Sequence, residues 1–197
     1  MDYVLEIPNN LSDEKCDEMI KRFESDDRKK PGVVGLVAKE TQVKRSMDLT
    51  ISSCSEWKDI DKYLYEQLSE GIKIYMKHLD DLGVSSHVGA SVQECYDNGY
   101  QMQRTSIGNY YSWHSDSMTA NGRFLTFLWY LSSHDPVEHG GGTGFHPSVG
   151  DGGKVIKPEK GKLIIFPATW TYLHMGFPLW SGDDKYVCTG WLHASST

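Results

Sequence analysis

The stretch KLIIFPATWTYLHMGFPLWSGDDKYVCTGWLH, residues 162–193, decides the fold of this chain of 197 residues. It contains two short β-branched and aromatic runs, KLIIFP and KYVCTGWLH, which predict two strands. A histidine, His174, lies between the runs and precedes a turn with Gly and Pro. Similar runs occur upstream in VGASVQECY, YQMQRTSI and RFLTFLWYL, so we predict β-structure from Val88 onward.

The first half of the chain has helical periodicity instead. After a short apolar segment at residues 3–7, Ser12 can cap a helix that extends past Phe23. A second helix is predicted over residues 55–82, with Gly71 as a candidate break and Gly83 as the stop. Helices that precede strands without alternating with them favour an α+β fold, in which the helices pack on one face of a sandwich or jelly roll.

The length is that of one domain, which we expect to span residues 1–197. Residues 1–87 would form a helical and strand support, and residues 88–197 would form the β-core that carries the site. The segment 25–45, rich in Gly, Lys and Asp, is predicted to be either a lid or an exposed hairpin.

Composition excludes several classes of protein. The net charge of -7 disfavours a nucleic-acid partner, because binding to phosphates needs clustered Lys and Arg. No uncharged apolar run approaches the roughly 18 residues that span a bilayer, so we expect no membrane association and a cytoplasmic location. The four cysteines are far apart and are predicted to be reduced thiols.

The motif NYYSWHSDS, residues 109–117, places His114 and Asp116 two positions apart. In a strand these side chains project to the same side, so both can reach one ion. His174 is the strongest candidate for a third ligand. Two histidines and one carboxylate are typical of non-haem Fe(II) oxygenases, but the same set also serves zinc hydrolases. The alternative without a metal is a pair of satisfied polar residues at a strand end.

A cation opens the last predicted strand. Period-2 alternation places Lys185, Val187, Thr189 and Trp191 on one face, so an ammonium, a hydroxyl and an aromatic ring could line one cavity. The alternative is an exposed lysine at the start of a strand.

Five segments resemble, in order and spacing, the catalytic core of the Fe(II)- and 2-oxoglutarate-dependent oxygenases, most closely the prolyl 4-hydroxylase branch. They are YYSWHSD, GRFLTFLWYLS, HGGGTGFHP, KVIKPEKGKLIIFP and LHMGFPLWSGDDKYVCTGWL. The resemblance implies a double-stranded β-helix. It also implies that His114, Asp116 and His174 are the catalytic metal ligands.

The resemblance further implies how the two substrates are bound. The residues implied to bind 2-oxoglutarate are Lys185, Tyr130 and Thr189. The residues implied to contact the substrate are Arg123, Trp191 and Tyr111.

The chain departs from the family pattern at two places near these residues. Many members carry a tyrosine where this chain has Thr105 beside Arg104. The turn before Lys185 is also longer than expected and contains Asp183 and Asp184.

The reaction implied by the resemblance is hydroxylation of a prolyl residue in a peptide or protein, with Fe(II), 2-oxoglutarate and O2, and with ascorbate as a candidate reductant. Succinate and CO2 are released. The carboxylate of Asp116 implies hydroxylation, because the related halogenating enzymes lack it. Two alternatives stay open: hydroxylation of a free amino acid or small metabolite, and a non-catalytic β-sandwich binding module that holds a metal. The sequence leaves the oligomeric state undetermined.

Overall fold

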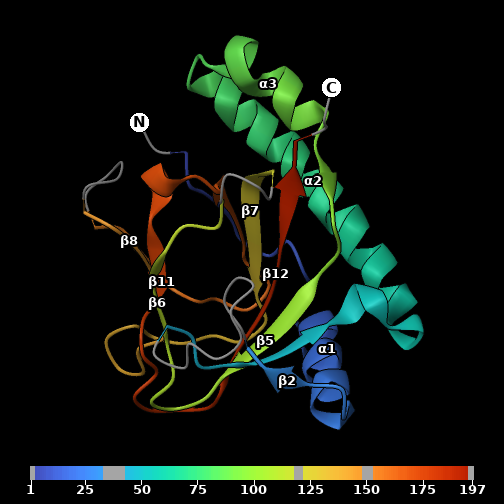
Figure 1. Cartoon of the computed structure of the whole chain (residues 1–197), viewed down its shortest axis with the longest axis vertical. Helices are drawn as coiled ribbons and strands as arrows, with labels where there is room; N and C mark the ends of the chain where they lie inside the picture. Colours follow the sequence, from blue (N-terminus) through green and yellow to red (C-terminus); the bar gives the residue numbers. More distant parts are fainter. Residues whose placement is uncertain (1–2, 33–42, 118–121, 148–152, 195–197) are drawn as a thin grey trace.

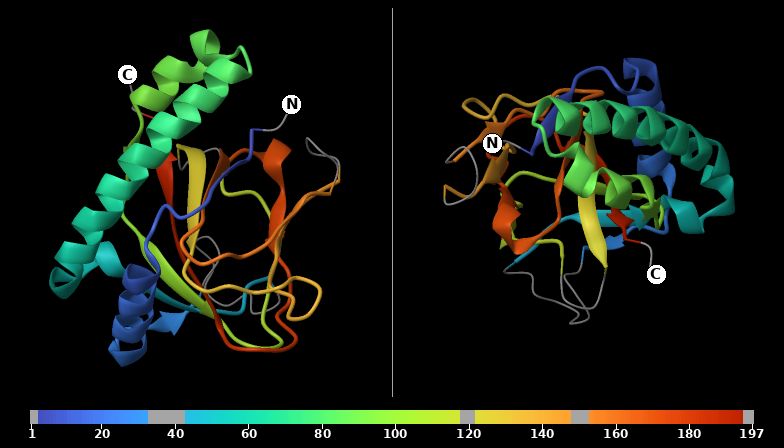
Figure 2. Two further views of the ribbon diagram at one scale, coloured as in Figure 1. Left: turned by 180° about the vertical axis from the view of Figure 1, so that it is seen from behind. Right: turned by 90° about the horizontal axis from the view of Figure 1, so that it is seen from above.

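The computed structural model describes residues 3–32, 43–117, 122–147 and 153–194 (Figure 1). Two antiparallel sheets face each other in this part of the chain, and the helices lie outside the larger sheet (Figures 1 and 2). This arrangement confirms the predicted α+β jelly roll with helices packed on one face. The middle of the predicted lid over residues 25–45 lies outside the described residues.

The larger sheet has the strand order β1-β10-β7-β12-β5-β3-β2, with β4 also paired to β12. Its strands are β1 (Leu5–Ile7), β2 (Lys30–Pro31), β3 (Met47–Thr50), β4 (Tyr96–Asp97), β5 (Gln101–Thr105), β7 (Arg123–Tyr130), β10 (Leu163–Pro167) and β12 (Lys185–His193). The smaller sheet has the order β6-β11-β8-β9. Its strands are β6 (Tyr111–His114), β8 (Thr143–Phe145), β9 (Val155–Ile156) and β11 (His174–Gly176).

Three α-helices are described: α1 (Asp13–Ser25), α2 (Lys58–Asp81) and α3 (Ser85–Gln93). Short 3-10 helices occur at Ile51–Ser53, Ser55–Trp57 and Trp170–Tyr172. The Ser12 side chain caps α1 by accepting a hydrogen bond from the Lys15 amide, as predicted. None of the helices described is both long and apolar enough to cross a membrane.

Alternation along the central strands separates a structural core from the interior between the sheets. On β7, Phe127 and Trp129 point outward and pack with the buried faces of α1 and α2. Thr126 and Leu128, which alternate with these residues along the strand, point to the other side and line a cavity between the two sheets. The helices therefore pack on the outer face of the larger sheet, and its inner face carries the cavity together with a second apolar cluster that includes Ile164, Phe166 and Val187.

Two predictions about secondary structure are wrong. The run VGASVQECY is not a strand: residues up to Gln93 form α3, because Val88 and Val92 are spaced four apart and pack on the core beside α2. Gly71 does not break the second helix, since α2 is continuous from Lys58 to Asp81. Gly71 is buried there, and a Cβ atom at this position would lie 2.5 Å from Leu163 Cδ2. Gly83 ends the helix as predicted, with φ of 73°.

Candidate active site

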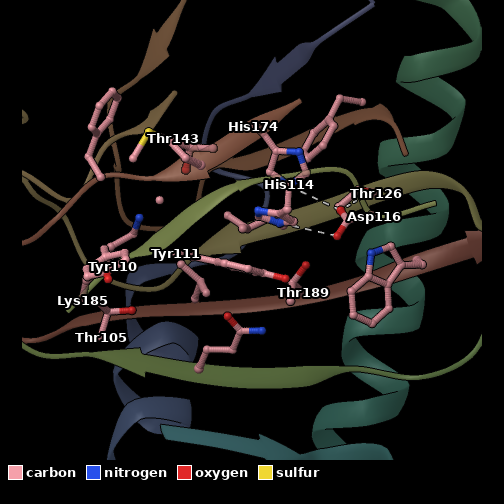
Figure 3. Close-up of a pocket in the computed structure, with 18 residues that line it drawn as sticks. Thr105, Tyr110, Tyr111, His114, Asp116, Thr126, Thr143, His174, Lys185 and Thr189 are labelled. Atoms are coloured by element: carbon pink, nitrogen blue, oxygen red, sulfur yellow. Dashed lines mark hydrogen bonds and ion pairs between the residues drawn. The ribbon is translucent and has the colours of Figure 1, made fainter. Parts of the chain in front are cut away.

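The smaller sheet brings the two predicted histidine ligands together. His114 is the last residue of β6, His174 is the first residue of β11, and the two are directly paired across the strands. Asp116 follows β6. His114 Nε2 lies 3.7 Å from Asp116 Oδ1, and His174 Nε2 lies 3.4 Å from Asp116 Oδ2. These three residues form the group among the described residues whose ligand atoms are placed to hold one metal ion (Figure 3).

Both imidazoles are oriented by the backbone. His114 Nδ1 lies 2.7 Å from the Ser112 carbonyl, and His174 Nδ1 lies 3.0 Å from the Tyr172 carbonyl. A carbonyl accepts only, so each Nδ1 carries the proton and donates it. The lone pair of each imidazole is then on Nε2, the atom that faces Asp116. This tautomer leaves Nε2 able to bind a metal. The donor set therefore fits a divalent metal.

The charges of the triad are also suited to metal binding. Burial, followed by the neighbouring His174, lowers the pKa of His114 to about 4. Burial works to raise the pKa of Asp116, but His174, His114 and a hydrogen bond from Thr126 outweigh it and hold that pKa below its ordinary value. At neutral pH, His114 is therefore neutral and Asp116 is ionised.

A single buried cation lies at the other end of the cavity (Figure 3). Lys185 is 7 % exposed, and its ammonium donates a hydrogen bond to the Gly141 carbonyl. Burial lowers the pKa of Lys185 to about 7. No carboxylate of the described residues forms an ion pair with this ammonium. A buried cation without a counter-ion is the complement of a ligand carboxylate.

The other two residues implied to bind 2-oxoglutarate differ in their access to the cavity. Thr189 lines it, and its hydroxyl donates to the Phe127 carbonyl at 2.8 Å. Tyr130 is fully buried, and its hydroxyl donates to Thr143 Oγ1 at 2.7 Å. Thr143 is the member of this pair that lines the cavity, so Tyr130 is placed to act through Thr143.

The three residues implied to contact the substrate lie around the triad. Tyr111 stacks on His114, with ring centroids 3.6 Å apart and planes at 12°. Trp191 lines the cavity, and the Arg123 guanidinium lies 3.4 Å from the centroid of its ring. Arg123 also donates to the Asp116 backbone carbonyl at 3.1 Å. The structure thus places Trp191 and Arg123 as one stacked wall beside the carboxylate of the triad.

The two departures from the family pattern lie on opposite faces of β5. Thr105 lines the cavity and is directly paired with Lys185 across β5 and β12. Arg104 points to the outer face, where it contacts Glu24 of α1. Thr105, with its small hydroxyl side chain, therefore takes the place of the tyrosine in the cavity. The Arg104 side chain lies on the opposite face of β5, outside the cavity.

Sequence reasoning missed two groups that complete the site. Thr126 donates a hydrogen bond of 2.7 Å to Asp116 Oδ2. A hydroxyl within the apolar run RFLTFLWY was the available signal, because a buried strand rarely carries a polar residue without a partner. The Gly141 carbonyl, the partner of Lys185, has no signal of this kind, since every residue carries a backbone carbonyl.

Comparison with known families agrees with this geometry. Residues 100–193 match the model of the 2OG-Fe(II) oxygenase superfamily. The matched segment runs from β5 to the end of β12 and contains the three residues of the triad. This segment of the chain is therefore similar to the 2OG-Fe(II) oxygenase superfamily. A sequence search of curated proteins finds no match.

Solved structures of prolyl hydroxylases share the fold over nearly the whole chain. A Trichoplax adhaerens prolyl hydroxylase, in complex with a hypoxia inducible factor oxygen degradation domain peptide fragment, has a TM-score of 0.77 at 16% identity, covering 98% of this chain and 84% of that one. The viral collagen prolyl hydroxylase of Paramecium Bursaria Chlorella virus-1, in its 2OG complex, has a TM-score of 0.68 at 22% identity, covering 98% and 97%. A Pseudomonas putida prolyl-4-hydroxylase has a TM-score of 0.68 at 13% identity, covering 96% and 92%.

The family and the triad together define the class of enzyme. The protein is a 2-oxoglutarate-dependent dioxygenase, with Fe(II) as its metal and 2-oxoglutarate and O2 as co-substrates.

Proposed function

We propose that this dioxygenase hydroxylates a prolyl residue of a peptide or protein. One observation supports the assignment of the co-substrate: the triad lies in one cavity with the ammonium of Lys185, which forms no ion pair with the described carboxylates. The assignment of the substrate is supported by the fold, which the chain shares over 98% of its length with two prolyl hydroxylases. One of these was solved with a peptide bound.

In this proposal His114, Asp116 and His174 hold Fe(II) through the two Nε2 atoms and the carboxylate. Lys185 binds the distal carboxylate of 2-oxoglutarate by a charge-assisted hydrogen bond, and the hydroxyls of Thr189 and Thr105 lie along the cavity to assist it. When bound, Fe(II) would supply the chemistry by which O2 oxidises 2-oxoglutarate to succinate and CO2, with one oxygen atom entering succinate and the other entering a C–H bond of the substrate.

Several residues of the chain orient the metal ligands and the co-substrate. Thr126 fixes the Asp116 carboxylate, and the backbone carbonyls of Ser112 and Tyr172 fix the two imidazoles. The Lys185 ammonium fixes the co-substrate at the opposite end of the cavity. The substrate would then lie against Trp191, Arg123 and Tyr111, which surround the triad.

The remaining predictions belong to the same proposal. The whole chain would act as one oxygenase domain. The four cysteines are free thiols, and three of them are buried, which supports a reducing compartment such as the cytoplasm.

Succinate formation tests the proposal. Protein purified without oxygen is supplied with Fe(II), 2-oxoglutarate and O2, with and without a cell lysate that is then searched by mass spectrometry for hydroxyproline. We expect the lysate to stimulate succinate formation and one of its proteins to gain hydroxyproline. The control is Asp116→Ala, which removes the carboxylate ligand.

Other outcomes decide against parts of the proposal. Stimulation by free amino acids, without modified protein, would assign the enzyme to a small metabolite instead. Iron binding without succinate above the level of Asp116→Ala would contradict an oxygenase of any substrate and favour the non-catalytic binding module.

A further inference from the structure

Asp184 and Lys185 are neighbours in sequence, but their side chains lie on opposite faces of the larger sheet. Lys185 lines the cavity between the sheets. Asp184 is directed to the outer face, where its Oδ2 lies 3.5 Å from Arg104 Nε. The sequence therefore places a carboxylate beside the cation that the co-substrate needs, and the fold separates the two groups.

Arg104 connects this carboxylate to a second one. Its Nη1 donates to both oxygens of Glu24, at 2.9 and 3.2 Å. Tyr186, directly paired with Arg104 across β12 and β5, donates its hydroxyl to Glu24 Oε1 at 2.9 Å. We call Glu24, Arg104, Asp184 and Tyr186 the Arg104 cluster. It joins the C-terminal end of α1 to the start of β12.

The cluster holds two carboxylates around one guanidinium. Desolvation lowers the pKa of Arg104, but the charges of Glu24 and Asp184 outweigh it and raise that pKa above its ordinary value. The side chains of Arg104, Glu24 and Asp184 are 26%, 38% and 32% exposed, so water screens their attraction only in part. Removing the guanidinium would leave two carboxylates close together without a cation, and they would repel each other.

A released Asp184 carboxylate would lie next to the Lys185 ammonium, whereas the ammonium of Lys160, in the same surface pocket as Asp184, is already bound to Asp17 at 2.7 Å. The ammonium of Lys185 is buried, and among the described residues its one hydrogen-bond partner is the Gly141 carbonyl. A carboxylate on the adjacent residue is tethered to that ammonium and has a high effective concentration there. Gly182, with φ of 82°, begins the turn that carries the aspartates and permits a backbone conformation that other residues resist.

We propose that Arg104 is a positioning residue for the co-substrate: it holds Asp184 on the outer face of β12 and thereby leaves Lys185 for the distal carboxylate of 2-oxoglutarate. This inference rests on the proposed role of Lys185. Arg104 contacts neither the metal ligands nor the cavity. Its effect is on the affinity for 2-oxoglutarate, and the affinity for the metal is unaffected.

Calorimetric titration of 2-oxoglutarate into the Fe(II)-loaded protein, without oxygen, measures this affinity without turnover. We expect Arg104→Gln to raise the Kd about three- to tenfold, a size typical of interacting neighbours. Asp184→Asn alone changes the Kd little, and Arg104→Gln combined with Asp184→Asn restores the wild-type value. The matched control is Arg22→Gln, because Arg22 is 27% exposed and also bridges two carboxylates, Glu18 and Asp59, on the helical side.

A second ligand separates positioning from general damage to the fold. 2-Oxobutyrate has the 2-oxo acid group but no distal carboxylate, so its Kd should not respond to Arg104→Gln. The inference is overturned if the double variant binds as weakly as Arg104→Gln, or if 2-oxobutyrate is weakened equally. It is also overturned if Arg104→Gln binds 2-oxoglutarate normally. Failure of the wild-type protein to bind 2-oxoglutarate would instead contradict the proposed function, and the inference with it.

Discussion

Thr126 donates a hydrogen bond of 2.7 Å to Asp116 Oδ2, and both side chains are buried between the sheets. Asp116 follows β6 of the smaller sheet, whereas Thr126 lies in the centre of β7 in the larger one. The bond therefore links the residue that follows β6 to a buried strand of the larger sheet. It fixes one carboxylate oxygen, so that the carboxylate cannot rotate away from the two histidines.

We expect Thr126→Val to weaken metal binding while the fold survives. Valine has nearly the shape of threonine but cannot donate a hydrogen bond, so Asp116 loses the group that orients it. Loss of such a partner of a metal ligand typically costs about 10- to 100-fold in metal affinity. Competition with a chelator, measured without oxygen, gives the Fe(II) affinity. Thr171→Val is the control at an exposed threonine, and an equal loss there would refute the assigned role.

The affinity for 2-oxoglutarate should depend on pH through Lys185. Burial lowers the pKa of Lys185 to about 7, so the free enzyme loses the ammonium as the pH rises above that value. Because the co-substrate carboxylate binds the charged form, the Kd should rise by up to about tenfold for each pH unit above about 7. Calorimetry across this range checks the slope. Lys185→Arg keeps its charge, so its profile should be flat in the same range.

Lys185 should also reduce the stability of the ligand-free protein. We expect Lys185→Met to raise the free energy of unfolding by about 1–3 kcal/mol, because it removes a buried ammonium that has no counter-ion within the described part of the chain. Lys162 is the matched contrast: it is 6% exposed, but its ammonium lies 2.9 Å from Glu6 and 2.7 Å from Glu159. Lys162→Met should lower the free energy by about 0.5–1 kcal/mol, since those carboxylates are partly solvated. Urea unfolding without 2-oxoglutarate measures both, and the same sign for both variants would contradict the argument.

The pH dependence of stability has a definite sign at Lys185. Its pKa in the folded state, about 7, is below the ordinary value of 10.5, so the folded protein releases the proton before the unfolded chain does. The unfolded chain then binds more protons between these values, and the contribution of Lys185 to stability rises with pH across that window. Lys185→Met should remove this contribution. A wild-type protein that loses stability relative to Lys185→Met over the window would show that the ammonium is not destabilised by burial.

The strands with strong apolar periodicity were predictable from the sequence, and short or irregular ones were not. The runs that became β7, β10 and β12 are β-branched, aromatic and bounded by turn residues, and each forms a strand of the larger sheet. The run VGASVQECY has β-branched residues too, but its Val88 and Val92 match a helical face equally well. Tertiary packing against α2 decides between the two, and a single sequence does not contain that information.

The site was predictable to the extent that alternation along one strand determines it. Lys185, Thr189 and Trp191 were expected on one face of the last strand, and all line the cavity. Contacts between strands distant in sequence were not predictable from the residues. The bond from Thr126 to Asp116 and that from Tyr130 to Thr143 depend on how the two sheets face each other.

Gly71 provides a test of packing between α2 and the larger sheet. Alanine favours a helix over glycine by about 1 kcal/mol, but a Cβ atom here would lie 2.5 Å from Leu163 Cδ2. Leu163 is fully buried, so the clash should cost about 1–3 kcal/mol through overpacking and outweigh the gain in helix propensity. We expect Gly71→Ala to be destabilising in urea unfolding, and Leu163→Val to recover part of the loss in the double variant. A net gain in stability from Gly71→Ala would show that α2 does not pack this closely on β10.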